Sequence, residues 1–185
     1  MCIRDSKLLW LSEPAAGPDG VQQLAAGLGA GALPAVTVLL IGRTHVGDAG
    51  ASALAAALGK GALPRLKSLA LGSAAIGDAG LVALAPALRR RPALEELVLW
   101  DNSFGDEGLA ALVAPPPAAG APPPPKGALA KLETLALWST QIADAGCATL
   151  AAAFGSGALP ALKSLDLNGI PASAESKAAV YAAFA

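Results

Sequence analysis

The sequence predicts an α/β solenoid in which short parallel strands alternate with helices. A five-residue phrase recurs along the chain, the leucines before each copy alternate with a period of two, and those after it return with a period near 3.6. The copies start at Val46 (VGDAG), Ile76 (IGDAG), Phe104 (FGDEG) and Ile142 (IADAG), which lie 30, 28 and 38 residues apart. This spacing suits one strand followed by one helix, so the chain is predicted to be an array of such units.

The expected strands carry the pattern L-x-x-L-x-L. Its positions are Val36, Leu39, Ile41; Leu66, Leu69, Leu71; Leu94, Leu97, Leu99; Leu132, Leu135, Leu137; and Leu162, Leu165, Leu167. Leu9 and Leu11 match the last two positions of a first, degraded unit. Side chains two apart in a strand share a face, so these leucines should be buried. We predict six units at about 6–35, 36–65, 66–93, 94–131, 132–161 and 162–185.

Each phrase is expected to open a helix, since leucines such as Leu84 and Leu88 then follow at helical spacing. The aspartates at its start are Asp48, Asp78, Asp106 and Asp144. A carboxylate there can accept hydrogen bonds from free amides and meets the positive end of the helix dipole. We therefore expect each aspartate to cap the helix that it begins.

Glycines are predicted to serve two further purposes. Two residues after each aspartate stands a glycine (Gly50, Gly80, Gly108 and Gly146), which is unfavourable inside a helix. We expect it to allow close packing between the helix and strand layers; a merely tolerated glycine is the alternative. The helices should end at the segments GAGALP, GKGALP and GSGALP, because glycine allows a left-handed cap and proline cannot continue a helix.

Composition limits the functions open to the chain. Its 185 residues are 54% hydrophobic but only 4% aromatic, so the core should consist of thin layers of leucine and alanine. The formal net charge is -1 and the sequence shows no basic stripe, which argues against nucleic acid and anionic membranes as partners.

No feature of the sequence points to secretion or to a membrane span. Cys2 and Cys147 are too few for a disulfide framework, and no CxxC pair is present, so a reducing, cytoplasmic location is expected. The start of the chain lacks the apolar core of a signal peptide. The uncharged run 20–42 contains glycines, glutamines and Pro34 and fits the repeat, so we interpret it as part of the solenoid.

The first six residues, MCIRDS, resemble the translation of a transposase end sequence that is joined to DNA fragments in some sequencing libraries. We interpret residues 1–6 as an artefact and 7–185 as the repeat domain. Neither end of the array shows a clear polar cap, so we expect the chain to be a fragment of a larger protein.

This pattern resembles the leucine-rich repeat family, specifically the ribonuclease-inhibitor-like class, and is similar to the repeat regions of Ran GTPase-activating and NOD-like receptor proteins. The resemblance covers nearly the whole chain and implies a horseshoe segment with strands on its concave face and helices on its convex face. The family usually places Asn three residues after the last strand leucine, and here only Asn102 does so. The other units have Pro14, Thr44, Ala74, Thr140 and Ile170. A looser stack is therefore expected.

A proline-rich insertion, 114–127, lengthens the fourth unit. Its prolines favour a polyproline II segment that could dock in an aromatic groove of the profilin, SH3 or WW kind. A tolerated low-complexity insertion in a surface connection is the alternative that we favour.

All three tryptophans fall at positions that should face the concave side, and none falls at a predicted core position. Trp100 and Trp138 occupy equivalent places in adjacent units, so their rings should lie side by side, as binding hot spots often do. The predicted partner-binding residues are Trp100, Trp138, Trp10, Glu96, Asp101 and Arg43. The alternative is that the tryptophan pair only covers the sheet and stabilises itself.

Catalytic sites are poorly supported. His45 is the single histidine, which excludes His-based triads and His-paired metal sites. The stretch Gly59-Lys60-Gly61 lacks the Ser or Thr of a phosphate loop, and the pairs Glu95-Glu96 and Asp106-Glu107 are better interpreted as solvated charges. We predict no metal, cofactor or small-molecule substrate.

The sequence therefore predicts a non-enzymatic module that binds a protein partner on its concave face. Two alternatives stay open. The resemblance to Ran GTPase-activating proteins would place Arg43, at a strand exit, near phosphate. The module could instead be the ligand-sensing tail of a larger receptor-like protein.

Overall fold

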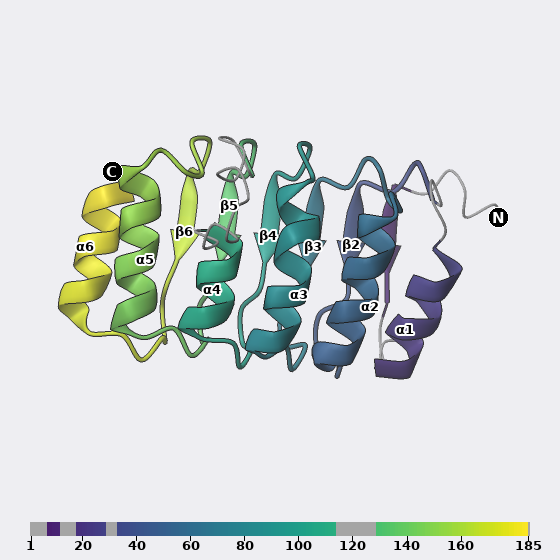
Figure 1. The fold of residues 1–185 in the computed structure, drawn as a ribbon, viewed down its shortest axis with the longest axis horizontal. Coiled ribbons are helices and arrows are strands. Elements are labelled where there is room, and N and C mark those ends of the chain that lie inside the picture. Colours follow the sequence, from purple (N-terminus) through teal and green to yellow (C-terminus); the bar gives the residue numbers. More distant parts are fainter. Residues whose placement is uncertain (1–6, 12–17, 29–32, 114–128, 185) are drawn as a thin grey trace, which may run out of the picture.

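A computed structural model describes residues 7–11, 18–28, 33–113 and 129–184, and within these ranges six strands alternate with six helices (Figure 1). In chain order the elements are β1 (Leu8–Trp10), α1 (Pro18–Gly27), β2 (Val38–Leu40), α2 (Gly47–Gly59), β3 (Ser68–Ala70), α3 (Asp78–Arg89), β4 (Glu96–Val98), α4 (Asp106–Val113), β5 (Thr134–Ala136), α5 (Asp144–Gly155), β6 (Ser164–Asp166) and α6 (Ala174–Phe184). The predicted α/β solenoid is confirmed. Residues 1–6 and the insertion at 114–127 lie outside the described residues.

The strands form one parallel sheet in the order β1 to β6, and the central leucine of each strand pairs with the next, as Leu39 does with Leu69 and Leu69 with Leu97. The helices cover one face of this sheet (Figure 1). We call the other face the open face. The strands leave the sheet along the strand-exit edge, at the bottom of Figure 1, and the helices end along the opposite, strand-entry edge.

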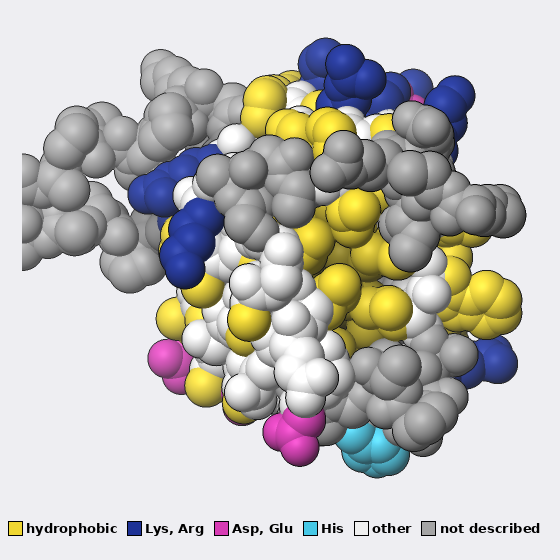
Figure 2. All heavy atoms as spheres, turned by 90° about the vertical axis from the view of Figure 1, so that its right-hand side faces the viewer, with side chains coloured by type: hydrophobic (Ala, Val, Ile, Leu, Met, Phe, Trp, Pro, Cys, Tyr) yellow, Lys and Arg dark blue, Asp and Glu magenta, His cyan; other side chains and the backbone are white. Residues whose placement is uncertain are grey.

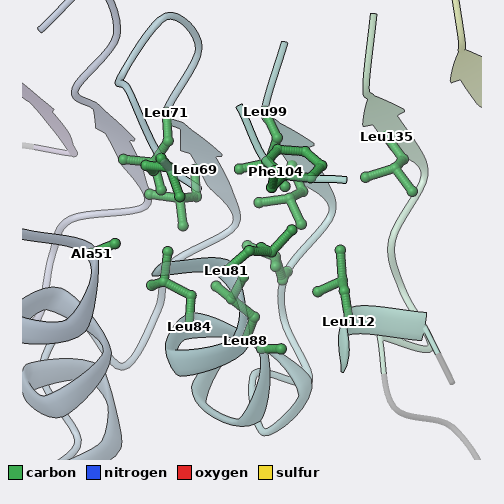
Figure 3. Close-up of a cluster of buried hydrophobic side chains, with 14 of the residues drawn as sticks. Ala51, Leu69, Leu71, Leu81, Leu84, Leu88, Leu99, Phe104, Leu112 and Leu135 are labelled. Atoms are coloured by element: carbon green, nitrogen blue, oxygen red, sulfur yellow. The ribbon is translucent and has the colours of Figure 1, made fainter. Parts of the chain in front are cut away.

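The core lies between the sheet and the helix layer. Leucines of the strands, such as Leu69 and Leu99, point toward leucines of the helices, such as Leu81 and Leu84 (Figure 3). The first residue of each phrase belongs to this core, because Val46, Ile76, Phe104 and Ile142 are fully buried. Phe104 is the largest side chain among the fully buried residues. The core thus consists of the leucines and alanines expected from composition together with the first residue of each recurring phrase.

The phrase aspartates lie at helix starts as predicted, but the amides that they cap belong to the next unit. The N–H groups of Gly77 and Gly80 donate to Oδ1 of Asp48 at 2.7 and 3.0 Å. Gly105 and Gly108 donate to Oδ1 of Asp78 at 2.9 and 2.7 Å. The expectation that each aspartate caps its own helix is wrong, because neighbouring helices lie close enough for the carboxylate to reach the following helix.

The same bond recurs in the last two units. The N–H of Ala143 donates to Oδ1 of Asp106 at 2.8 Å, and that of Ser173 donates to Oδ1 of Asp144 at 2.7 Å. The hydrogen bond from the Ser173 backbone, and then those from the hydroxyls of Ser173 and Ser176, hold the pKa of Asp144 below its usual value. Each carboxylate therefore acts as a clamp between two consecutive helices.

These clamps explain three of the four glycines that follow the phrase aspartates by two residues. A Cβ atom on Gly80 would lie 2.5 Å from Oδ1 of Asp48 and 2.9 Å from Cγ2 of Ile76. On Gly146 it would lie 2.3 Å from Oδ1 of Asp106. Close packing was the correct reason for these glycines, but at Gly80, Gly108 and Gly146 the tightest contact is with the aspartate of the preceding helix and not with the strand layer. At Gly50 the nearest atom is Cγ1 of Val46, at 2.8 Å.

Helices α2 and α5 end at the predicted glycine segments, and residues 29–32 of the third segment, 29–34, lie outside the described residues. At the end of α2 the N–H of Gly61 donates to the carbonyl of Leu58 at 2.9 Å, and that of Ala62 donates to Ala57 at 3.1 Å. Gly61 has a φ of +91°. This is the hydrogen-bond pattern of a Schellman cap, which requires a left-handed residue that glycine adopts without strain.

Side chains of the last unit occupy the outer edge of β6. In the other units the N–H after the strand bonds to the following unit, as Leu137 N–H does to Asp166 O at 3.0 Å. Here the N–H of Leu167 donates to the Tyr181 hydroxyl at 3.3 Å, and that of Asn168 to Oδ1 of Asp166 at 3.0 Å. These two amides thus have side-chain partners in place of a further strand.

In the described ranges no helix has the length and apolar character that crossing a bilayer requires.

The clamp geometry gives Gly80→Ala the opposite sign from that expected of helix propensity. Alanine in a helix is favoured over glycine by about 1 kcal/mol, yet the new methyl group would collide with Asp48. We expect a net loss of about 1–3 kcal/mol in the free energy of unfolding, measured by urea denaturation. Gly59→Ala in α2, whose Cβ would meet nothing within 4 Å, is the control and should be neutral or stabilising. Equal effects of the two substitutions would contradict the clamp.

Candidate functional site

One row of residues on the open face follows the last leucine of each strand. In the described units it consists of Gly42, Gly72, Trp100, Trp138 and Asn168. The rings of Trp100 and Trp138 are stacked, with centroids 4.6 Å apart and planes 4° from parallel. Both side chains are half-buried. The adjacent placement that the sequence predicts for this pair is therefore observed.

Gly72 makes room for the stack. A Cβ atom on Gly72 would lie 2.3 Å from Cε2 and 2.5 Å from Nε1 of Trp100, so the indole ring occupies the space that a side chain would fill. One face of the Trp100 ring thus covers Gly72 and the other contacts Trp138. The rings are fixed in position by their neighbours in the row, and a rigid aromatic surface loses little conformational entropy when it binds a partner.

The residue after each member of this row has a left-handed backbone. The φ values are 60° at Arg43, 53° at Ser73, 52° at Asp101, 54° at Ser139 and 68° at Gly169. Only the last is a glycine, and a left-handed conformation costs other residues roughly 1–2 kcal/mol. The repeat imposes the same sharp turn at the exits of β2 to β6, so the side chains of Arg43, Ser73, Asp101 and Ser139 form a polar rim beside the tryptophan row.

Asn102 secures the loop that carries Trp100. Its Nδ2 donates to the carbonyls of Leu71, Leu99 and Trp100 at 2.8, 2.9 and 3.1 Å. Its Oδ1 accepts from the N–H groups of Ala74 and Ile76 at 3.2 and 2.9 Å. This buried amide therefore ties the exits of β3 and β4 together.

The residues that stand in the place of Asn102 in the other units form fewer hydrogen bonds, as the sequence predicts. The hydroxyls of Thr44 and Thr140 donate only to carbonyls of their own units, those of Ile41 at 3.1 Å and Leu137 at 2.8 Å. Asn102, in contrast, forms hydrogen bonds to the preceding unit, and it does so directly beside Trp100.

The tryptophan row, the polar rim and the loops that follow them line an open cavity of about 880 Å³ along the strand-exit edge. It extends across the exits of four strands, β2 to β5. Its lining residues are Arg43, Thr44 and His45; Ser73 and Ala75; Trp100, Asp101, Asn102 and Ser103; and Trp138, Ser139 and Gln141. The two indole rings supply its large apolar surface, and the rim supplies one cation, one anion and several hydroxyl and amide groups.

The structure brings together four of the six predicted site residues. Arg43, Trp100, Asp101 and Trp138 all line the cavity. Trp10 lies on the open face at β1 and is 71% exposed, but it does not line the cavity. Its strand is the first of the sheet, whereas the cavity begins at the exit of β2.

Glu96 also lies outside this cavity. It begins β4 at the strand-entry edge, where its Oε2 accepts a hydrogen bond of 2.6 Å from the Ser68 hydroxyl. Of the two acidic residues predicted to bind a partner, only Asp101 therefore lies beside the tryptophans. Glu96 is the first residue of β4, and the length of the strand separates it from the strand exit.

Sequence reasoning missed the remaining polar lining, including His45, Ser73, Ser103 and Gln141. They stand one to three residues beyond the tryptophan row in their units. Counting outward from the row would have selected them, but only the left-handed turn shows that they face the same cavity. Among the described residues, no group of three or more His, Cys, Asp or Glu side chains is arranged to hold a metal ion.

Comparisons with known proteins agree with this architecture. The family model described as Leucine Rich repeat matches residues 63–85 and 92–113. Among solved structures, leiomodin-1 actin-binding site 2 aligns with a TM-score of 0.58 at 15% identity, covering 90% of this chain and 86% of that chain. An internalin from Listeria monocytogenes aligns with a TM-score of 0.40 at 15% identity, covering 86% of this chain and 48% of the internalin. A search of the curated proteins found no match.

The family model shows leucine-rich repeats in residues 63–85 and 92–113, and the repeated strand–helix units give the described part of the chain a leucine-rich repeat fold. Domains of this family are typically protein–protein interaction modules. The narrower assignment to the ribonuclease-inhibitor-like class stays a prediction from the sequence.

Gly72→Ala should separate the tryptophan pair without removing either ring. The added methyl group would meet the Trp100 ring at 2.3 Å, so the ring must leave the row. The coupled indole signal in the near-ultraviolet circular dichroism spectrum should fall by about half or more, since ring coupling depends on close stacking. Gly42→Ala is the matched control, because its Cβ would meet the Gly72 carbonyl at 3.1 Å and no ring. An unchanged signal in Gly72→Ala would contradict the described packing.

Proposed function

We propose that this domain is a non-enzymatic module that binds a protein partner through the strand-exit part of its open face. The observation that carries the proposal is the stacked pair of Trp100 and Trp138 inside an open cavity. Neither ring is in the core, and both keep part of their surface in contact with solvent. Tryptophan is among the residues most enriched at the energetic centres of protein interfaces.

The surroundings of the pair favour a protein partner. Arg43 and Asp101 stand on the rim with opposite charges, and hydroxyl and amide groups lie between them. An apolar centre with a polar rim is the usual anatomy of a protein interface. The lining comes from four consecutive strand exits, so an extended or loop segment of a partner can contact several units at once.

Self-stabilisation of the tryptophan pair is the competing explanation. A stacked aromatic pair contributes about 0.5–1.5 kcal/mol beyond the area that it buries. That gain needs only two rings in contact and does not account for the cavity beside them. The solved structure of leiomodin-1 is named as an actin-binding site, which fits a binding role for this fold. At 15% identity that likeness concerns the fold, and actin is not carried over to this chain.

The double variant Trp100→Ala/Trp138→Ala should lose its partner. In a quantitative pull-down from a lysate of the source cells, at least one protein retained by the parent domain should fall by about tenfold or more, the effect of removing an interface hot spot. Far-ultraviolet circular dichroism and urea denaturation must first show that the variant stays folded.

Trp10→Ala is the matched control. It also removes a tryptophan from the open face, but Trp10 lies outside the cavity. The same protein should be retained by this variant within about twofold of the parent, since exposed residues away from a hot spot contribute little. Equal retention by the parent and the double variant would contradict the proposed site.

A further inference from the structure

The charges of the described residues separate onto the two edges of the solenoid. From the last helical turn to the start of the next strand, the strand-entry edge carries Lys7, Lys60, Arg65, Lys67, Arg89, Arg90, Arg91, Lys131 and Lys163 against Glu95, Glu96 and Glu133. From each strand exit through the first helical turn, the strand-exit edge carries Arg43 and Lys177 against Asp19, Asp48, Asp78, Asp101, Asp106, Glu107, Asp144 and Glu175. The formal charges are therefore +6 and -6, with Asp166 of β6 assigned to neither edge.

The sequence shows no basic stripe, but the fold gathers cations from separate units at one edge. In Figure 2, Lys and Arg side chains gather mainly in the upper part of the molecule, at the strand-entry edge, and the visible Asp and Glu lie mostly lower. The overall net charge of -1 concealed the pattern, because the two edges nearly cancel. The fold separates the charges because every unit places its helix end and its helix start at opposite edges.

The densest part of the basic edge surrounds the junction of α2 and β3. Nη1 of Arg91 donates to the carbonyl of Leu63 at 3.1 Å, and Nη2 donates to the carbonyl of Leu58. Lys60 and Arg65 each follow one of these carbonyls by two residues. Arg91 thereby holds the end of α3 against the turn between α2 and β3. Arg90, the residue before it, therefore lies beside the same turn.

Lys60, Arg65 and Arg90 are all exposed, and no ion pair joins them to the described residues. We call these three residues and Arg91 the basic patch. Two other cations on this edge are neutralised, since Lys67 pairs with Glu95 at 2.8 Å and Lys163 with Glu133 at 2.9 Å. The pKa of Arg89 is lowered by burial and then by the positive charge of Arg90, which indicates local crowding of like charges.

Helix dipoles explain only part of the patch. Lys60 and Arg90 occupy the C-cap positions of α2 and α3, where a cation is stabilised by the negative end of the helix. Arg65 lies in the turn before β3 and gains nothing comparable. Like charges gathered at a surface repel one another, so a structural role alone would favour a neutral residue there.

We propose that the basic patch is a second binding surface, which takes a carboxylate-rich segment of a partner protein. Arg65 and Arg90 expose guanidinium groups, whose planar forks match the two oxygens of a carboxylate. The patch lies on the edge opposite the tryptophan cavity, so it is independent of that site. A partner that covers both would have to reach around the uncovered face of the sheet.

The extent of the patch favours a short acidic peptide over nucleic acid. Beyond Lys67 the same edge continues with Glu95 and Glu133, whose backbone amides and carbonyls link them in one row. These carboxylates limit the positive surface to about two repeat units. A surface that binds nucleic acid needs to be longer, because it contacts many successive phosphates. The patch residues also include no aromatic side chain on which a base could stack.

The test measures binding of a fluorescein-labelled oligoglutamate peptide to the whole domain by fluorescence anisotropy, at about 50 mM NaCl, where charge attraction is only partly screened. Saturable binding is expected. Arg65→Glu and Arg90→Glu should each weaken it by about tenfold, because each replaces an attraction with a repulsion. Both side chains are exposed, so the fold should be retained, and urea denaturation checks this. Arg65→Gln should give a smaller loss in the same direction.

Lys177→Glu is the matched control, since it changes the net charge equally but lies in α6 at the strand-exit edge, outside the cavity. It should alter the affinity by less than about twofold. Three results would overturn the proposal: no saturable binding of the peptide, an equal loss in Lys177→Glu, or tighter binding of single-stranded DNA or of phosphatidylserine vesicles than of the peptide. None of these depends on the tryptophan cavity, so the two proposals can fail separately.

Discussion

The hydrogen bonds from each phrase aspartate to the helix of the next unit are the constraint on which the rest of the structure depends. One carboxylate oxygen of Asp48 or Asp78 accepts two amides of the following unit, and those amides would otherwise be unpaired at a helix start. The bond sets the distance between neighbouring helices and requires glycine where they meet. Because the bond repeats, α3, α4 and α5 are each held by the aspartate of the preceding helix and each hold the following one. Stability in a solenoid depends on such contacts between neighbouring units.

The clamp on the helix side and the strand ladder on the sheet side together fix the offset between units, and the candidate site follows from that offset. Trp100 and Trp138 stack because equivalent residues of adjacent parallel strands stand about 4.8 Å apart. Gly72 then accepts the ring of Trp100, and Asn102 fastens the loop below it. The tryptophan surface is rigid because backbone and side chains of the neighbouring units hold the two rings, in addition to the contact between the rings themselves.

Much of this architecture can be predicted from the sequence, and the limits have a physical cause. The leucine spacing identified the strands because burial on one face of a sheet requires alternation. It also placed the tryptophans on the open face. The destination of the aspartate bonds, the fit of Gly72 under an indole ring and the neutralising of Lys67 by Glu95 could not be read in this way. They join residues about one unit apart, and their contact depends on an offset that no single unit encodes.

The central claim is tested most directly by amide hydrogen exchange in Asp78→Ala, measured residue by residue by NMR. The clamp predicts that the amides of Gly105 and Gly108, at the start of α4, exchange about tenfold faster, the effect of losing a hydrogen bond to a charged group. The start of α3, where Asp78 itself stands, should keep its protection, because the amide of Gly80 is bonded to Asp48. Faster exchange in α3 with unchanged protection in α4 would show that the aspartate caps its own helix and would contradict the account.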